Sequence, residues 1–151
     1  MSGFTRIELD GRVVEKAGYQ QVSGRGMYGD GWSQIYRPEP HGFASSPVAG
    51  AKGIIIPDPR NPDMAFMLGG EHASHRPGNL PGGGVALYDS SGNILKFIGT
   101  GLVIDVPGRT VTATCGTWKI VGNFEVDGNI HTTGNITASG TITDSDGNNG
   151  A

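Results

Sequence analysis

The chain has 151 residues, including 27 Gly and 9 Pro, one Cys, and a formal net charge of −3. This length suits one domain with an appendage. The small acidic charge, without any run of Lys and Arg, argues against nucleic acid as a partner. No apolar stretch approaches the roughly 18 residues of a membrane span, the N-terminus lacks the apolar core of a signal peptide, and Cys115 alone excludes a disulfide framework. We therefore expect a soluble protein made in the cytoplasm.

The first two thirds of the chain predict short strands joined by turns. Apolar alternation or β-branched residues mark seven segments, nearly all separated by Gly, Pro, Asp, Asn or Ser. The predicted strands are Ile7–Val14, Tyr19–Met27, Gly53–Ile56, Met64–Leu68, Val85–Tyr88, Ile94–Ile98 and Leu102–Ile104. The clearest hairpin joins Val85–Tyr88 to Ile94–Ile98 through a loop that contains Gly92. No apolar pattern at helical spacing persists for ten residues, so residues 1–104 are predicted to form a small closed or partly open β-barrel of five or more strands.

A second pattern begins after a junction at residues 105–115. From there glycine recurs at every sixth position, at Gly116, Gly122, Gly128, Gly134 and Gly140. The residues two and four positions after each glycine are mostly large and apolar. All of them have even numbers, and alternate residues of an extended chain point to the same side, so these side chains share one face. The predicted inward face consists of Trp118, Ile120, Phe124, Val126, Ile130, Ile136, Ala138 and Ile142. Short repeats of this kind predict a β-helix.

The length of the repeat decides which kind of β-helix is expected. A three-sided helix built from one chain needs about 18 residues per coil. Residues 116–145 supply fewer than two such coils, and a stub of that size would expose its apolar face and its strand edges. If three copies wind around one axis, each copy supplies one side and the repeat makes five layers. The sequence therefore predicts a homotrimer with the five glycines at its corners.

The inward residues also change along the repeat. The series Ile120, Val126, Thr132, Ala138 and Asp144 becomes smaller and more polar toward the C-terminus, which predicts a tapering needle. The last residues, 146–151, have no apolar side chain larger than Ala151, so they are expected to be flexible or ordered only against a cap.

Two stretches of the chain resemble a known family. Gly69–Pro77 (GGEHASHRP) and then Gly84–Asp89 (GVALYD), with Gly92 following, resemble the Mu-type central spike of contractile-tailed bacteriophages, also called baseplate assembly protein V. The resemblance covers about residues 4–145. It implies an all-β chain with an N-terminal OB-fold-like barrel followed by a trimeric triple-stranded β-helix.

The resemblance also implies a function, which is structural and not enzymatic. It places the homotrimer in the virion, at the tail baseplate, where the barrel meets the hub and tail tube proteins. When the sheath contracts, the spike is driven against the host outer membrane.

One feature of that family is missing from this sequence. Its spikes commonly end in a His-x-His motif that binds an axial iron, and no such motif occurs here. We therefore expect no metal and no other cofactor, and a tip that is either blunt or completed by a separate protein. His131 lies at an odd-numbered position of the repeat, where the alternation turns it toward solvent.

An enzyme is the alternative interpretation of the repeat. Hexapeptide-repeat acyltransferases form left-handed β-helices with the same period, and His131 would then be the general base. The small number of coils argues against that function. Glu71, His72 and His75 have spacing suited to a metal or acid–base site, but no helix fixes their geometry, so we expect a structural loop. Cys115 is expected to be a small buried residue.

Overall fold

The computed structural model describes residues 3–61 and 64–143. Within those residues the chain is all-β, with eight strands, and it contains no helix that is long and apolar enough to cross a membrane. The chain divides into two units, Met1–Val111 and Thr112–Ala151. Asp144 and the predicted tail at 146–151 lie outside the described residues.

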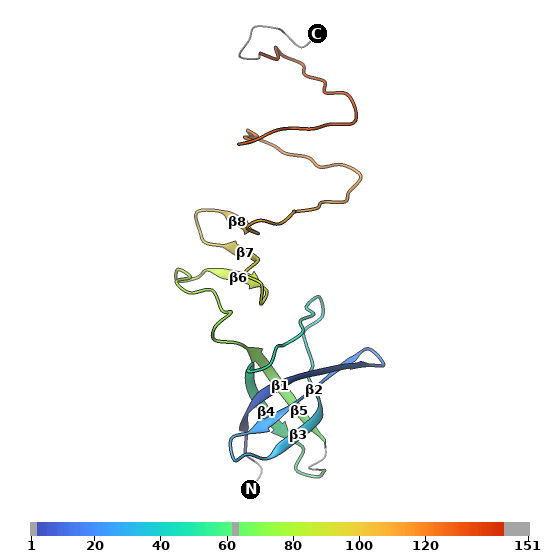
Figure 1. Cartoon of the computed structure of the whole chain (residues 1–151), viewed down its shortest axis with the longest axis vertical. Helices are drawn as coiled ribbons and strands as arrows, with labels where there is room; N and C mark the ends of the chain where they lie inside the picture. The colour runs from blue at the N-terminus through green and yellow to red at the C-terminus, as the bar shows by residue number, and fades with distance from the viewer. Residues whose placement is uncertain (1–2, 62–63, 144–151) are drawn as a thin grey trace. The chain divides into compact units, whose positions relative to one another are not determined.

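Five strands of the first unit close into a barrel (Figure 1). They are β1 (Thr5–Lys16), β2 (Tyr19–Gly26), β3 (Gly31–Tyr36), β4 (Lys52–Pro57) and β5 (Ala65–Glu71). Their order around the barrel is β1-β2-β3-β5-β4, and β4 returns to pair with β1. Every pairing is antiparallel except that of β3 with β5. The all-β class and the closed barrel are thus confirmed, and the topology is consistent with the OB-fold-like prediction.

The barrel core follows from the two-residue alternation of the strands. The buried apolar side chains are Ile7, Leu9, Val22, Ile35, Ala51, Ile55, Ala65 and Met67, with Val13 and Trp32 packed beside them. Alternate residues of a strand point to opposite faces, so Ile7 and Leu9 enter the core while Glu8 between them faces water. Ile55 and Met67, which pair across β4 and β5, are completely inaccessible to solvent.

The extent of the barrel differs from the sequence prediction. Strand β3 was not predicted, because Trp32–Gln34 lacks the β-branched alternation of its neighbours and Gln34 adopts a left-handed φ of 54°. The remaining three strands, β6 (Val85–Tyr88), β7 (Ile94–Phe97) and β8 (Leu102–Asp105), were assigned to the barrel, but they form a separate antiparallel sheet in the order β6-β7-β8. The hairpin expected between the first two of these is confirmed. The barrel itself ends with β5, because the strands close on one another there.

A close approach of two strands makes one glycine essential to the barrel. Gly24 of β2 pairs with Leu9 of β1, and a Cβ at this position would overlap the backbone of Glu8 and Leu9. We expect Gly24→Ala to lower the free energy of unfolding by about 1–3 kcal/mol, the usual cost of overpacking. Gly31→Ala is the matched control, because nothing lies within 4 Å of its Cβ position. Hydrogen exchange of the β1 and β2 amides measures the loss of stability in both variants. Equal protection of these amides in the two variants would refute the steric overlap as the reason for glycine at position 24.

Candidate functional site

The glycine repeat is the candidate functional site, and in a single chain its described residues form almost no hydrogen bonds with one another. Figure 1 shows residues 112–143 as an extended trace in wide turns, with no strand assigned among them. Within the described part of this segment, one hydrogen bond occurs, from the Thr132 hydroxyl to the Gly134 carbonyl at 3.1 Å. Its backbone N–H and C=O groups therefore need partners from outside the chain or from water.

The predicted inward face of the repeat is exposed in the single chain. Trp118, Phe124, Ile130 and Ile136 each leave about two thirds of their surface accessible, from 65% to 67%, and the smaller Ala138 is exposed as well. The other three are somewhat less accessible, with Ile120 at 46%, Val126 at 39% and Ile142 at 51%. An apolar surface of this extent marks an interaction site in a stable protein. The single chain does not test the trimer core, which stays a prediction.

The glycines of the repeat do not all adopt the same conformation. Gly122 and Gly128 have φ values of 130° and 150°, which side chains with a Cβ rarely adopt. Gly116, Gly134 and Gly140 lie outside that region of φ. In the single chain, the positive φ predicted for every corner therefore occurs at two of the five.

Sequence analysis missed a second exposed apolar surface, on the β6–β8 sheet. The register pairs Val85 with Phe97, Leu87 with Leu95, Leu95 with Ile104 and Phe97 with Leu102. Because paired residues point to the same side of a sheet, one face consists of Val85, Leu87, Leu95, Phe97, Leu102 and Ile104. All of these except Leu95 are at least half exposed. The sequence carries little signal for this face, because Val85–Tyr88 and Leu102–Ile104 are apolar at every position, and the strands were assigned to the barrel wall, where a core would have covered them.

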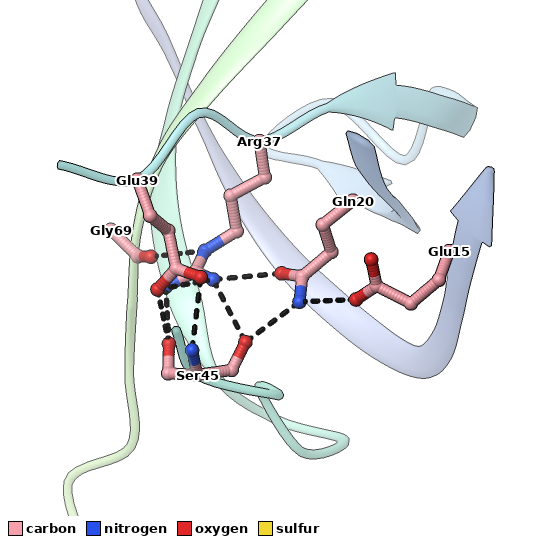
Figure 2. A network of polar contacts seen from close by, with 6 residues as sticks. All are labelled: Glu15, Gln20, Arg37, Glu39, Ser45 and Gly69. Atoms are coloured by element: carbon pink, nitrogen blue, oxygen red, sulfur yellow. Dashed lines mark hydrogen bonds and ion pairs between the residues drawn. The ribbon is translucent and has the colours of Figure 1, made fainter. Parts of the chain in front are cut away.

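The barrel contains a buried polar network centred on Arg37 (Figure 2). Arg37 follows β3 and is only 9% exposed. Its guanidinium donates to the Gly69 carbonyl at 2.7 Å, to Gln20 Oε1 at 2.7 Å and to the Ser45 hydroxyl at 2.9 Å. It also pairs with the Glu39 carboxylate at 3.1 Å. These contacts tie the long connection between β3 and β4 to β2 and β5, so the network has a structural role.

The carboxylate in this network is held in its charged form. Burial opposes ionisation of Glu39, but hydrogen bonds from the Ser45 hydroxyl at 2.6 Å and amide at 2.9 Å, together with Arg37, outweigh it. The pKa of Glu39 therefore lies below its ordinary value of 4.5. The folded chain consequently binds fewer protons than the unfolded chain near that pH.

This lowered pKa predicts how barrel stability depends on pH. The ionised Glu39 carboxylate contributes fully to the free energy of unfolding when the pH is above the ordinary pKa of a glutamate. This contribution is lost as the pH falls through the lower pKa that Glu39 has in the folded state. Glu39→Gln is expected to be less stable than the wild type at pH 7, and the difference is expected to shrink toward pH 3. Urea unfolding at pH 7, 5 and 3 measures it. A difference that stays constant over this range would show that Glu39 contributes through its shape alone.

The loop at Glu71–Arg76 is more ordered than the sequence suggested. The amides of His75 and Arg76 both donate to the His72 carbonyl at 3.0 Å, and the two histidine rings stack with centroids 4.2 Å apart. Glu71 forms an ion pair with Arg76 at 2.8 Å. The segment is a loop without a helix, as expected, and a tight turn of this loop brings the two imidazoles together. Among the described residues, no group of three or more His, Cys, Asp or Glu could hold a metal ion.

Two single residues of the second unit were also assigned from the sequence. His131 is exposed, but so are the even-numbered positions beside it, so its direction in the proposed needle stays a prediction. Cys115 is exposed as well, contrary to the expected burial. The reason is that the described part of this unit has no buried residue, so its chain offers nothing for a small side chain to pack against.

Comparison with known proteins gives one family. Residues 11–73 match the family model described as Bacteriophage Mu Gp45, N-terminal. The matched range begins within β1 and ends just after β5, so it covers most of the closed barrel. No curated protein matches the chain. Through this barrel, the chain is similar to the Mu-type family of phage baseplate and spike proteins.

Proposed function

We propose that the chain is the homotrimeric central tail spike of a contractile phage or phage-like baseplate. The family of its barrel supports a structural role in a phage tail or baseplate. The observation that carries the finer proposal is the exposed apolar face of the repeat, which follows that barrel and which a single chain leaves uncovered. Three copies can cover this face by turning it toward a common axis.

The spike would act through stiffness. In three chains braided around one axis, the amides and carbonyls of each chain pair with its neighbours, so no strand edge remains free. Bending or unzipping such a rod must break many hydrogen bonds together, and force is therefore transmitted to its tip. The outward residues are polar and keep the shaft soluble; they include Asn129, Thr133, Asn135, Thr137, Ser139, Thr141 and Thr143.

The proposal assigns a place and partners to each part. The barrel docks under the hub and tail tube proteins of the virion, residues 105–115 form the junction, and residues 116–145 form the needle. On sheath contraction the needle crosses the host outer membrane, with or without a separate tip protein. In this role the chain has no enzymatic activity, binds no cofactor and needs no nucleic acid.

The molar mass and shape of the wild-type chain test this proposal. Light scattering combined with small-angle X-ray scattering is expected to give three chains in an elongated particle. A monomer would refute the spike. A compact trimer that binds an acyl donor would instead support the hexapeptide-repeat acyltransferase.

A further inference from the structure

We propose that the outer wall of the barrel binds a saccharide chain through three neighbouring aromatic rings. These are Tyr19 at the start of β2, Tyr36 at the end of β3 and Phe66 on β5, which we call the aromatic row. The inference goes beyond the proposed spike, because the row lies within the barrel of one chain and does not depend on how many copies assemble.

Strand register places the three rings next to one another on the outside of the barrel. Tyr36 pairs with Phe66 on β5 and with Gln21 on β2, and Tyr19 lies two positions before Gln21, on the same side of its strand. Ile35 is in the core, so the alternation turns Tyr36 outward. The ring centroids of Tyr19 and Tyr36 are 5.2 Å apart and those of Tyr36 and Phe66 are 5.9 Å apart, and both pairs meet edge to face. The rings therefore form one continuous row.

The aromatic row is open to solvent and has a shallow hollow toward each end. Tyr19 is 56% exposed and Phe66 is 40% exposed. One hollow, of about 500 Å³, lies beside Tyr19 and is also lined by Lys16 and Gln21. The other, of about 420 Å³, lies beside Phe66 and is also lined by Arg60. The row thus combines aromatic rings with polar side chains at both ends.

A saccharide has the two kinds of surface that such a row recognises. The C–H groups of a pyranose ring pack against aromatic rings, whose faces are electron-rich. Each sugar hydroxyl both donates and accepts hydrogen bonds. Gln21 Oε1 is a buried acceptor that has no hydrogen-bond partner among the described residues. Buried polar atoms rarely lack a partner, and a turn of this amide toward the hollow lets a sugar hydroxyl donate to it.

Size, charge and hydrogen bonding disfavour three other partners. A stable protein interface covers about 800 Å² on each side, far more than the three rings and their two hollows present. Nucleic acid requires several Lys or Arg contacts to phosphates, whereas Lys16 and Arg60 are the only such residues that line the hollows, in a chain of net charge −3. Proline-rich peptides also dock on aromatic rows, but a run of proline has no N–H group to donate to Gln21.

Binding of defined trisaccharides to the wild-type chain is the first test. Cellotriose, maltotriose and chitotriose are titrated by calorimetry, and saturation-transfer NMR identifies the sugar protons that contact the protein. At least one of the three is expected to bind saturably, with the strongest transfer to the C–H protons of its rings. No saturable binding by any of them, or binding of a decaproline peptide in their place, would overturn the inference.

Two exposed tyrosines provide the matched variants. Tyr19→Leu keeps an apolar side chain but removes the ring, so the affinity for the bound trisaccharide is expected to fall about tenfold, whereas Tyr19→Phe is expected to lose less. Tyr28→Leu is the control, because Tyr28 lies in the β2–β3 turn, outside the row, and is almost fully exposed. Equal affinities of the two leucine variants would contradict the assigned site.

The molar mass separates this inference from the proposed spike. A monomeric wild-type chain that binds the trisaccharide through Tyr19 would refute the spike and support the saccharide site. An elongated trimer that binds none of the three sugars would support the spike and refute the saccharide site.

Discussion

Ile136→Asp is expected to abolish the trimer, whereas Thr137→Asp is expected to leave it intact. In the proposed needle, Ile136 of each chain faces the axis, so the substitution buries three carboxylates close to one another. Burying one unpaired charge costs several kcal/mol, and the mutual repulsion of three adds to this. The exposed Asp at position 137 has no such cost. Light scattering and resistance to dissociation in SDS measure the difference.

The two variants form a matched pair. They introduce the same residue at adjacent positions, so differences in composition and backbone propensity cancel. In the single chain Ile136 is 66% exposed, so an aspartate there costs the monomer little, and loss of the trimer reports on the interface. Equal effects of both substitutions would contradict the assigned inward face.

The barrel strands show what alternation can and cannot predict. β1 and β2 were predictable because Ile7, Leu9 and Val22 alternate with polar residues on strands with one buried face. β3 was not predicted, because its partly or fully buried residues Trp32 and Ile35 lie three positions apart, with Gln34 between them in a left-handed conformation. A bend of this kind breaks the two-residue period on which the prediction depends.

The exposed faces show a different limit. Val85–Tyr88 is apolar at every position and Leu102–Asp105 at its first three, so the sequence indicates strands but neither which side is covered nor what packs against it. These strands could therefore be assigned to the barrel although they form their own sheet. In the repeat, the glycine period defines the face from sequence alone. In the proposed trimer, burial of this face comes from other copies of the chain, so a single chain cannot display it.

The Arg37 network could not be predicted, because its contacts join residues that lie far apart in the sequence. Arg37 donates to Gln20, 17 positions earlier, and to Gly69, 32 positions later. Neither neighbour forms a motif with Arg37. Only the closure of the barrel brings β2, the β3–β4 connection and β5 together around one guanidinium.

Arg37→Met is expected to destabilise the barrel by about 3 kcal/mol, because removing one partner of a buried ion pair leaves the other uncompensated. The substitution removes the cation that pairs with the Glu39 carboxylate and a donor to Gln20 Oε1 and to the Gly69 carbonyl. Arg37→Lys is the control: it keeps the charge but lacks the planar fork that reaches several acceptors at once, so an intermediate loss is expected. Urea unfolding measures the free energies, and hydrogen exchange assigns the loss to β2 and residues 38–46.

A double-mutant cycle separates the ion pair from the rest of the network. If Arg37 acts mainly by neutralising Glu39, Arg37→Met combined with Glu39→Gln is expected to cost clearly less than the sum of the two single changes. Additive losses would instead assign the stabilisation to the hydrogen bonds with Gly69 and Gln20. Because the proposed trimer contacts lie in the glycine repeat and not in the barrel, the molar mass of the folded Arg37 variants is expected to stay that of the wild type. Dissociation of the trimer by Arg37→Met under folding conditions would show that the barrel also holds the copies together.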